Sequence, residues 1–366
     1  MSHAFVVSAS IPHNLGIGKS VPTRKRKTAR AATASSGKSR PSDFRLGQIV
    51  RLLMDHATVV VSGTKIAQEI ETTRSEVWRL IQQLRRLSVD IAGHPATGYQ
   101  LRAVPDLLLP DILRPMLKGT IFAEKIRHYY RVGSTNAEAM DAAGKGADEG
   151  SVFLAEEQTA GRGRGSHGWH SARSTGIYCS VLFRPALPPA DVLTLSLAVG
   201  LAVQSAVEEV VPGTCPDLKW PNDVLLEGKK FCGILTELAA EATRVRHVVA
   251  GIGINVNHAA FPASLRDEAT SLRLATGTEC SRVELTAALL KSLDREYRSL
   301  LGGAAGRDSV LRRFAERSSY VRGKKVTVEE NGGFEGVTEG LDPRGFLQVR
   351  TAQGVRTVLS GTVRPV

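Results

Sequence analysis

The apolar positions between residues 44 and 104 predict three helices followed by a two-stranded hairpin. FRLGQIVRLLMDH and SGTKIAQEI have helical apolar spacing, and TRSEVWRLIQQLRRLSV puts five apolar side chains on one helix face: Val77, Leu80, Ile81, Leu84 and Leu87. VDIAGHPATGYQLRAV then alternates around a turn at Ala96 to Gly98, which is typical of two paired strands. This order predicts a winged helix-turn-helix over residues 44–104.

In a winged helix-turn-helix the third helix enters the major groove of DNA. Thr72 or Thr73 is expected at the N-cap of that helix, and the candidate DNA contacts are Thr73, Arg74, Ser75 and Arg79. One position departs from the pattern, because Glu71 stands in the turn where Gly is usual and adds negative charge near the phosphates. DNA binding and a non-binding docking role both stay open for this unit.

The pattern changes over residues 119–318, after a proline-punctuated connection, PDLLLPDILRPMLK, with a short helix. ADVLTLSLAVGLAVQSAVEEVV and SRVELTAALLKSLDREYRSLL have the length of helices, and the first is apolar nearly all round, which predicts burial. The predicted strands are SVFLAEEQ, GIYCSVLFRP, DLKWPNDVLLEGKKFCGILTEL and RHVVAGIGINVN. Since several strands follow one another directly, a mixed or antiparallel sheet backed by helices is expected.

Residues 319–366 carry short alternating strands, KKVTVEE, FEGVTEGLD, GFLQVRT and VRTVLSGTV, joined by NGG, DPRG and AQG turns. This spacing predicts a small SH3-like β-barrel. The fold class is therefore α+β in three units.

Composition is that of an ordinary soluble globular protein, with 42% hydrophobic and 23% charged residues in a chain of 366. We find neither a signal-peptide pattern nor an apolar run of about eighteen residues, so a cytoplasmic protein without a membrane span is expected. The four cysteines lack CxxC spacing and predict buried free thiols rather than a zinc site or a disulfide framework.

The formal charge of +12 is concentrated at the N-terminus. Residues 1–43 hold eight Lys and Arg residues against the single Asp43, a net +7. This tail has no sustained apolar period and is expected to be disordered. A nucleic-acid-binding arm and a solvated leader are both compatible with it.

The stretch GRGRGSHGW, residues 161–169, poses the first chemical question. It contains a formal GxGxxG, but it leads into another strand rather than a helix, so a dinucleotide-binding turn is excluded. The remaining interpretation is an anion-binding loop in which Arg162 and Arg164 hold a phosphate or carboxylate and Trp169 is an apolar anchor. A flexible surface turn is the alternative.

Three further stretches add polar groups suited to an anionic ligand. KWPND places Lys219 near Asn222 and Asp223, a combination suited to a polyphosphate with Mg²⁺, although PND is also a common turn. Lys230 opens an apolar strand, where a desolvated ammonium group needs an anion unless the strand end is solvated. Asn255 in GIGINVN follows two glycines, which allow a flat ligand to approach or mark a bulge.

The stretch GSTN supplies the small polar cluster Ser134, Thr135 and Asn136 at a helix start, where an N-cap is the simpler explanation. In chain order, STN, EEQTAGRGRGSHGWHS, KWPNDVLL, GKKFCGIL with the following TE, and GIGINVN resemble biotin protein ligases. The leading winged helix resembles the bifunctional bacterial form that also represses biotin genes. The resemblance covers residues 44–366.

The resemblance implies a catalytic domain of class II synthetase-like fold and assigns roles to this chain's residues. Lys230 and Arg164 are implied as catalytic. The residue patterns described above give Asp223 as the expected ligand of Mg²⁺, and Lys219, Asn222, Asn255 and Trp169 as the expected ATP and adenylate contacts. The implied biotin contacts are Ser134, Thr135, Asn136, Gln158, Arg162, Gly163, Arg164 and Lys230.

The implied reaction joins biotin to ATP as biotinyl-5′-AMP and then transfers biotin to a lysine of the biotin carboxyl carrier protein of acetyl-CoA carboxylase. Lys230, Arg164 and Mg²⁺ would offset the repulsion between the two anions, and the Gly/Arg loop would exclude water from the adenylate. Operator DNA and a second copy of the chain are further expected partners. A biotin-sensing regulator without ligase activity and a lipoate-type ligase stay open as alternatives.

Overall fold

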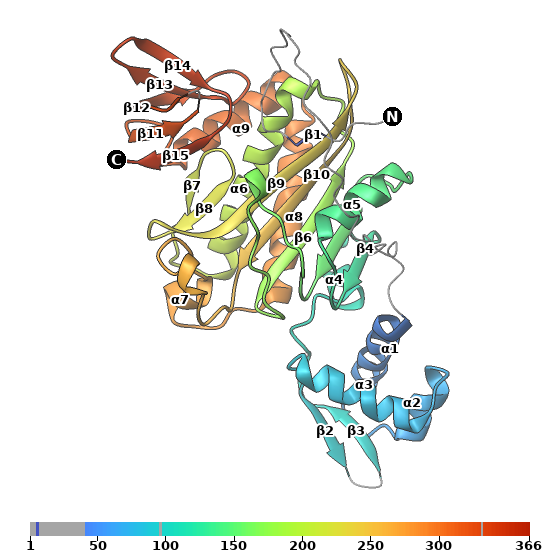
Figure 1. The fold of residues 1–366 in the computed structure, drawn as a ribbon. Coiled ribbons are helices and arrows are strands. Elements are labelled where there is room, and N and C mark those ends of the chain that lie inside the picture. Colours follow the sequence, from blue (N-terminus) through green and yellow to red (C-terminus); the bar gives the residue numbers. More distant parts are fainter. Residues whose placement is uncertain (1–4, 7–40, 95–96, 331) are drawn as a thin grey trace, which may run out of the picture.

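The N-terminal unit is the predicted winged helix-turn-helix (Figure 1). The computed structural model describes residues 5–6, 41–94, 97–330 and 332–366. Helices α1 (Pro41–Asp55), α2 (Gly63–Glu69) and α3 (Arg74–Arg86) precede a wing made of β2 (Ile91–His94) and β3 (Gly98–Leu101). Their apolar faces share one core of their own. The first helix begins three residues before the boundary at residue 44 that the sequence predicts.

The turn between α2 and α3 explains the unusual Glu71. This residue adopts a left-handed conformation with a φ of 49°, the backbone geometry that makes Gly common at such turns. Thr73 is the N-cap of α3, and its Oγ1 accepts a hydrogen bond from Glu76 N at 3.2 Å. The predicted turn is therefore formed although its usual residue is absent.

Residues 1–4 and 7–40 of the predicted basic tail lie outside the described residues. The prediction of disorder is therefore not tested for most of the tail. Two described parts of the tail are ordered: residues 41–43 belong to α1, and β1 (Phe5–Val6) pairs antiparallel with Leu238 and Glu237 of the central sheet. The prediction of disorder is therefore wrong for these residues, and β1 completes an eight-stranded sheet.

The central unit is built on a mixed sheet with the order β4-β5-β6-β10-β9-β8-β7. Only the β4–β5 pair in this order is parallel, so the predicted mixed sheet is confirmed. The strands are β4 (Ile126–Tyr129), β5 (Val152–Ala155), β6 (Gly176–Phe183), β7 (Asp217–Lys219), β8 (Asp223–Leu226), β9 (Lys229–Ala240) and β10 (Val245–Asn255).

Side-chain alternation divides this sheet into two different faces. One face packs on α6 (Val192–Val210) and α8 (Arg282–Leu300), and α9 (Ala304–Glu316) packs on these two helices; all three share the main core with the sheet. The opposite face packs on α5 (Thr135–Gly144), through a small cluster that includes Tyr178, Leu182 and Val249. In Figure 1, α5 lies on the near side of the strands and α6 and α8 lie behind them. The near face holds the candidate site.

The helix α6 is buried in the centre of the fold, as its apolar sequence predicts. Residues Pro189–Val210 form one helical segment that is long and apolar enough to cross a membrane, and 78% of its apolar window is buried within the protein. Burial among sheet and helices accounts for this hydropathy. The short helices α4 (Pro110–Met116) and α7 (Leu272–Thr276) complete the helices of the central region.

The C-terminal unit is a five-stranded antiparallel sheet with the order β14-β13-β12-β11-β15. Its strands are β11 (Lys325–Glu329), β12 (Phe334–Leu341), β13 (Leu347–Thr351), β14 (Gly354–Val358) and β15 (Thr362–Pro365). The last predicted strand is divided in two at Leu359 to Gly361. This unit docks on the central one, where Trp220 Nε1 donates a hydrogen bond to Gly345 O at 2.9 Å.

All four cysteines are free. Cys179 and Cys232 are buried as predicted, whereas Cys215 is exposed and Cys280 half-buried. Burial raises the pKa of the Cys179 thiol to about 12, so this thiol stays protonated at neutral pH.

Candidate functional site

A patch of bare backbone forms the floor of the candidate site. Gly251 and Gly253 lie two residues apart on β10 and share a face, and Gly233 of β9 lies directly opposite Gly253. A Cβ atom at Gly253 would lie 2.5 Å from the Trp169 ring, and one at Gly233 would lie 2.8 Å from it. Glycine is required here because the indole lies directly on the sheet.

A cluster of small polar side chains forms one end of the site. Ser134, Thr135 and Asn136 come from the start of α5 and are buried. Ser180 of β6 donates a hydrogen bond to Asn136 Oδ1 at 2.6 Å and lies 2.8 Å from Thr135 Oγ1. Asn136 Nδ2 in turn donates to Glu237 Oε2 at 2.9 Å. The cluster is a fixed array of donors and acceptors in a buried place.

Gln158 connects this cluster to the glycine-arginine loop. Its Oε1 accepts from Thr135 N at 2.9 Å, and its Nε2 donates to Ser171 Oγ at 2.9 Å. The side chain thus joins the start of α5 to the end of the loop. The sequence alone pointed to Gln158 only through the family resemblance.

The glycine-arginine loop folds over the sheet as a short turn. Gly163 N donates to His167 O at 2.7 Å, and Gly165 at its tip has a φ of 60°. Arg162 Nη2 lies 3.2 Å from Glu237 Oε2, and Arg164 Nη1 donates to Asn222 Oδ1 at 3.1 Å. Burial lowers the pKa of Arg164, although the charge of Asp223 opposes this effect. Both guanidinium groups therefore face the sheet.

A β-bulge aims Lys230 at the same place. Val224 of β8 pairs with Cys232, but the next residue, Leu225, pairs with Lys230, so Phe231 is an extra residue in β9. Phe231 and Cys232 both lie in the main core. Lys230 consequently lies on the glycine face, where its side chain reaches Gly233. Regular alternation would have put the ammonium group into the core with Cys232.

Lys230 is paired with a carboxylate in this structure. Its Nζ lies 2.6 Å from Asp223 Oδ1 and 5.5 Å from the centre of the Trp169 ring. A cationic lysine held between an acid and an aromatic face is a binding point for an anion that can replace the acid. In the part of the chain that the structure describes, no group of three His, Cys, Asp or Glu side chains is placed to hold a metal.

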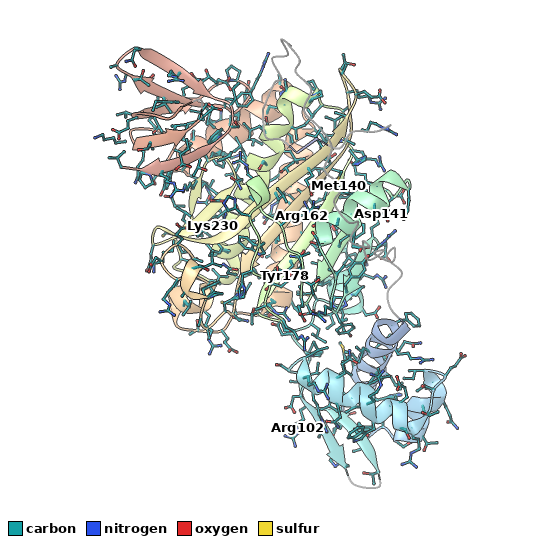
Figure 2. All side chains as sticks on the ribbon, viewed as in Figure 1. Arg102, Met140, Asp141, Arg162, Tyr178 and Lys230 are labelled. Carbon is teal, nitrogen blue, oxygen red and sulfur yellow. The ribbon has the colours of Figure 1, made fainter. Side chains whose placement is uncertain are left out.

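These groups line one open cavity, and Figure 2 shows Arg162, Tyr178 and Lys230 on the same face of the central sheet. The cavity wall includes Ser134, Thr135, Asn136, Gln158, Arg162, Gly163, Arg164, Trp169, Tyr178, Asn222, Lys230, Gly233, Gly251 and Gly253. Ten of the thirteen residues that the sequence suggested for this site are thereby brought together.

The other three candidates, Lys219, Asp223 and Asn255, lie beside the cavity wall. Lys219 is paired with Asp223 across β7 and β8, and burial lowers its pKa. Asn255 Nδ2 donates to Thr270 O at 3.1 Å, while its buried Oδ1 has no hydrogen-bond partner among the described residues. Their predicted nucleotide and metal contacts stay predictions.

Sequence reasoning missed Ser180, Glu237, Tyr178 and the floor glycine Gly233. Tyr178 and Ser180 lie two residues apart, on the same face of β6. Every residue of this strand is buried, so the polar face could not be recognised from the sequence. Glu237 lies in a strand of apolar residues, where a buried acid is a sign of function.

A buried ion network ties the loop to the linker that follows the winged helix. Arg282 Nη1 lies 2.8 Å from Glu156 Oε2, and its Nε lies 3.0 Å from Asp106 Oδ2. Glu156 Oε1 accepts from Leu108 N, and Glu156 O accepts from Ser174 N. Burial alone would raise the pKa of Glu156, but Arg282 and the hydrogen bonds from His128 and Leu108 hold it at about 2.

The candidate DNA contacts lie together at the start of α3. Thr73, Arg74, Ser75 and Arg79 are exposed. The Arg79 guanidinium is already engaged, since it donates to both oxygens of Glu76 at 2.8 and 2.6 Å. These hydrogen bonds lower the pKa of Glu76 and raise that of Arg79. Their DNA contacts stay predictions.

Comparison with known families defines the class of protein. Residues 130–255 match the biotin/lipoate A/B protein ligase family. Residues 45–100 match a helix-turn-helix domain, and residues 322–364 match the biotin protein ligase C-terminal domain. The three matches follow the three units of the fold, so the class is a ligase with a helix-turn-helix domain.

Individual relatives define the family more closely. The chain is 33% identical to the bifunctional ligase/repressor BirA of Bacillus subtilis, over 86% of this chain and 97% of that protein. It is 36% identical to the biotin–(acetyl-CoA-carboxylase) ligase of Mycobacterium tuberculosis, over 63% and 84%. The chain belongs to the biotin protein ligase family, in the form that carries a helix-turn-helix repressor domain.

A solved structure supports the fold assignment. The biotin protein ligase of Aquifex aeolicus in complex with biotin and ATP superposes with a TM-score of 0.58 at 28% identity. It covers 66% of this chain and its own whole length. The family and the named relatives confirm the enzyme class and the three-unit architecture that the sequence predicts.

Proposed function

We propose that this ligase joins the biotin carboxylate to the α-phosphate of ATP, releases pyrophosphate, and transfers biotin from the resulting adenylate to a lysine of a biotin carboxyl carrier domain. The observation that carries the proposal is the convergence of Lys230 and Arg164, on a glycine floor, with the polar cluster around Asn136. Two cations beside a buried polar array suit a ligand with an anionic tail and a hydrogen-bonding head.

The polar cluster favours biotin over lipoate. The ureido ring of biotin has two N–H donors and a carbonyl acceptor, which match Thr135, Asn136 and Ser180. The dithiolane ring of lipoate offers neither, so it would cover these polar groups without adding hydrogen bonds to them. The roles proposed for Ser134, Gln158, Arg162 and Gly163 are to complete this pocket and to cover it.

Lys230 and Arg164 act where the two anions meet. In the resting site Asp223 neutralises Lys230 at 2.6 Å, and the arriving carboxylate and phosphate take the place of that acid. The two cations offset the repulsion between the reactants and stabilise the charge that develops on the phosphoryl oxygens. No protein nucleophile is needed, because the biotin carboxylate itself attacks phosphorus.

Asp223 is proposed as the protein ligand of Mg²⁺. Its buried Oδ1 lies 2.6 Å from Lys230 Nζ, and a single carboxylate with phosphate oxygens and water is a common magnesium environment. The ion would supply positive charge on the polyphosphate. Lys219 and Asn222 flank the same place, and Asn255 has a free carbonyl oxygen, so these three are proposed as nucleotide contacts.

The loop that carries Arg162 and Arg164 protects the adenylate. Trp169 lies flat on the glycine floor, and a closed loop excludes the water that would hydrolyse a mixed anhydride.

We propose the carrier protein of acetyl-CoA carboxylase as acceptor, operator DNA as a partner of the winged helix, a homodimer as the DNA-binding form, and the cytoplasm as the place of action.

Replacement of Lys230 tests the ligase chemistry. Lys230→Ala should slow biotin-dependent release of pyrophosphate by at least about 10²-fold. Lys229→Ala is the matched control, because the neighbouring lysine is exposed and its Nζ lies 3.5 Å from Arg266 O, away from the cavity. Equal rates for Lys230→Ala and the wild type would remove Lys230 from the mechanism.

A second measurement separates the substrates. The intact chain is incubated with ATP, radiolabelled biotin and a carrier domain, and excess lipoate is added as competitor. We expect transfer of biotin that lipoate does not reduce. Strong competition by lipoate would instead support a lipoate-type ligase.

A further inference from the structure

The recognition helix α3 carries an exposed tryptophan that no role above has used. Trp78 is 58% exposed, although the other large apolar residues of α3, Val77, Leu80, Ile81 and Leu84, are buried. It lies one helical turn after Arg74, so the two side chains share the outer face of the helix. A large aromatic side chain in this place is not part of the core.

The outer face of α3 suits a polyanion. The helix contains Arg74, Arg79, Arg85 and Arg86 against the single acid Glu76, a net charge of +3. The acid is neutralised by Arg79 at 2.6 Å. A cationic helix beside a wing fits the regularly spaced phosphates of a duplex nucleic acid. We therefore favour a duplex over an acidic or apolar protein surface as the partner.

Two of these arginines are already hydrogen-bonded within the unit. Arg79 is bound by both oxygens of Glu76. Arg85 donates from Nε and Nη2 to Ile91 O, at 3.1 and 2.8 Å, and thereby fixes the wing against α3. At the N-terminal half of the helix, which meets base edges in this motif, the groups that remain available are Arg74, Ser75 and Trp78.

We propose that Trp78 is a specificity-determining residue for DNA, packing its indole against thymine C5-methyl groups in the major groove. Each thymine presents there an apolar methyl that an apolar side chain reads, whereas arginine reads guanine. Arg74 beside it supplies contact to phosphate or guanine. The inference rests on the proposed DNA binding of the winged helix and names the residue that reads the sequence.

The test begins with a pool of random 30-base-pair duplexes, selected on the intact wild-type chain in the presence of biotin and ATP. The enriched duplex is then titrated with the wild type, Trp78→Ala, Trp78→Phe and Phe44→Ala by fluorescence anisotropy. Phe44 is a matched control, since it is an aromatic residue of the same unit, 65% exposed, on α1. Biotin transfer to the carrier domain is measured for each variant as a check of folding.

We expect Trp78→Ala to weaken binding at least tenfold and Trp78→Phe to retain most of the affinity, because a phenyl ring still covers a methyl group. Phe44→Ala should bind like the wild type, and all variants should transfer biotin at the wild-type rate. Replacing the enriched thymines by uracil should weaken binding by the wild type several-fold and leave binding by Trp78→Ala unchanged.

Three results would overturn the inference. One is binding by Trp78→Ala within twofold of the wild type. Another is an equal effect of uracil on both proteins, which would show that the indole does not read methyl groups. The third is a change of oligomeric state in Trp78→Ala with unchanged DNA affinity, which would assign the residue to a protein interface. If no sequence is enriched at all, DNA binding itself fails, and this inference with it.

Discussion

Glu156 offers a quantitative test of the buried ion network. The structure holds its pKa at about 2, against an ordinary value of 4.5, because Arg282 and two hydrogen bonds outweigh the cost of burial. A difference of about 2.5 pKa units corresponds to about 3 kcal/mol of folding free energy at neutral pH, at roughly 1.4 kcal/mol per unit. Glu156→Gln keeps the shape and removes the charge, so it should cost about that amount.

The sign of the pH dependence follows from the lowered pKa. The stabilisation is fully present above pH 4.5, where the unfolded carboxyl is ionised, and is lost as the pH falls towards 2. The difference in unfolding free energy between the wild type and Glu156→Gln should therefore shrink from about 3 kcal/mol at pH 7 to about 1 kcal/mol at pH 3. Urea unfolding followed by circular dichroism and tryptophan fluorescence measures it.

The neighbouring acid provides the control. Glu157 pairs with Arg131 and Arg173, whose side chains are 59% and 47% exposed, so Glu157→Gln should cost less than about 1 kcal/mol. Equal destabilisation by the two substitutions would refute the argument from burial. A deficit of Glu156→Gln that stays constant down to pH 3 would refute the assigned charge state.

Three further substitutions test the site. Gly253→Ala should raise the KM for biotin or ATP at least tenfold, because its Cβ would lie 2.5 Å from Trp169, whereas Gly144→Ala, which meets open space, should leave steady-state kinetics unchanged. Ser180→Ala should raise the KM for biotin about tenfold by leaving Asn136 Oδ1 without its donor; an unaltered KM in a biotin titration would exclude the hydroxyl from the pocket. Asp223→Asn should raise the Mg²⁺ concentration for half-maximal pyrophosphate release about tenfold, and identical metal titrations would argue against the proposed ligand.

The sequence predicted elements whose cause is local. The all-apolar pattern of α6 and the spacing of Val77, Leu80 and Leu84 on α3 follow from the need to bury one helix face, so both helices are where the pattern indicates. The winged helix-turn-helix was predictable in spite of Glu71. Its left-handed backbone shows that the turn was specified by the neighbouring helices rather than by Gly.

The parts that sequence reasoning missed depend on pairs distant in the chain. Ser180 meets Asn136 across 44 positions, and Arg282 meets Asp106 across 176, so neither contact leaves a local pattern. The linker before residue 119 therefore looked like a simple connection, although Asp106 and Leu108 bind the catalytic unit. The residue patterns and the family resemblance together pointed to ten cavity-lining residues, but neither revealed what holds them in place.

The extra residue at Phe231 lets β9 meet two requirements that a regular strand could not meet together: Phe231 and Cys232 both lie in the core, and Lys230 faces the cavity. Deleting Phe231 would convert the strand to a regular ladder in which Lys230 still pairs with Leu225 and still faces the cavity, while the core loses one aromatic side chain. Such a protein should keep its phosphate-facing charge and lose stability. The additional residue therefore serves the packing behind the sheet rather than the chemistry in front of it.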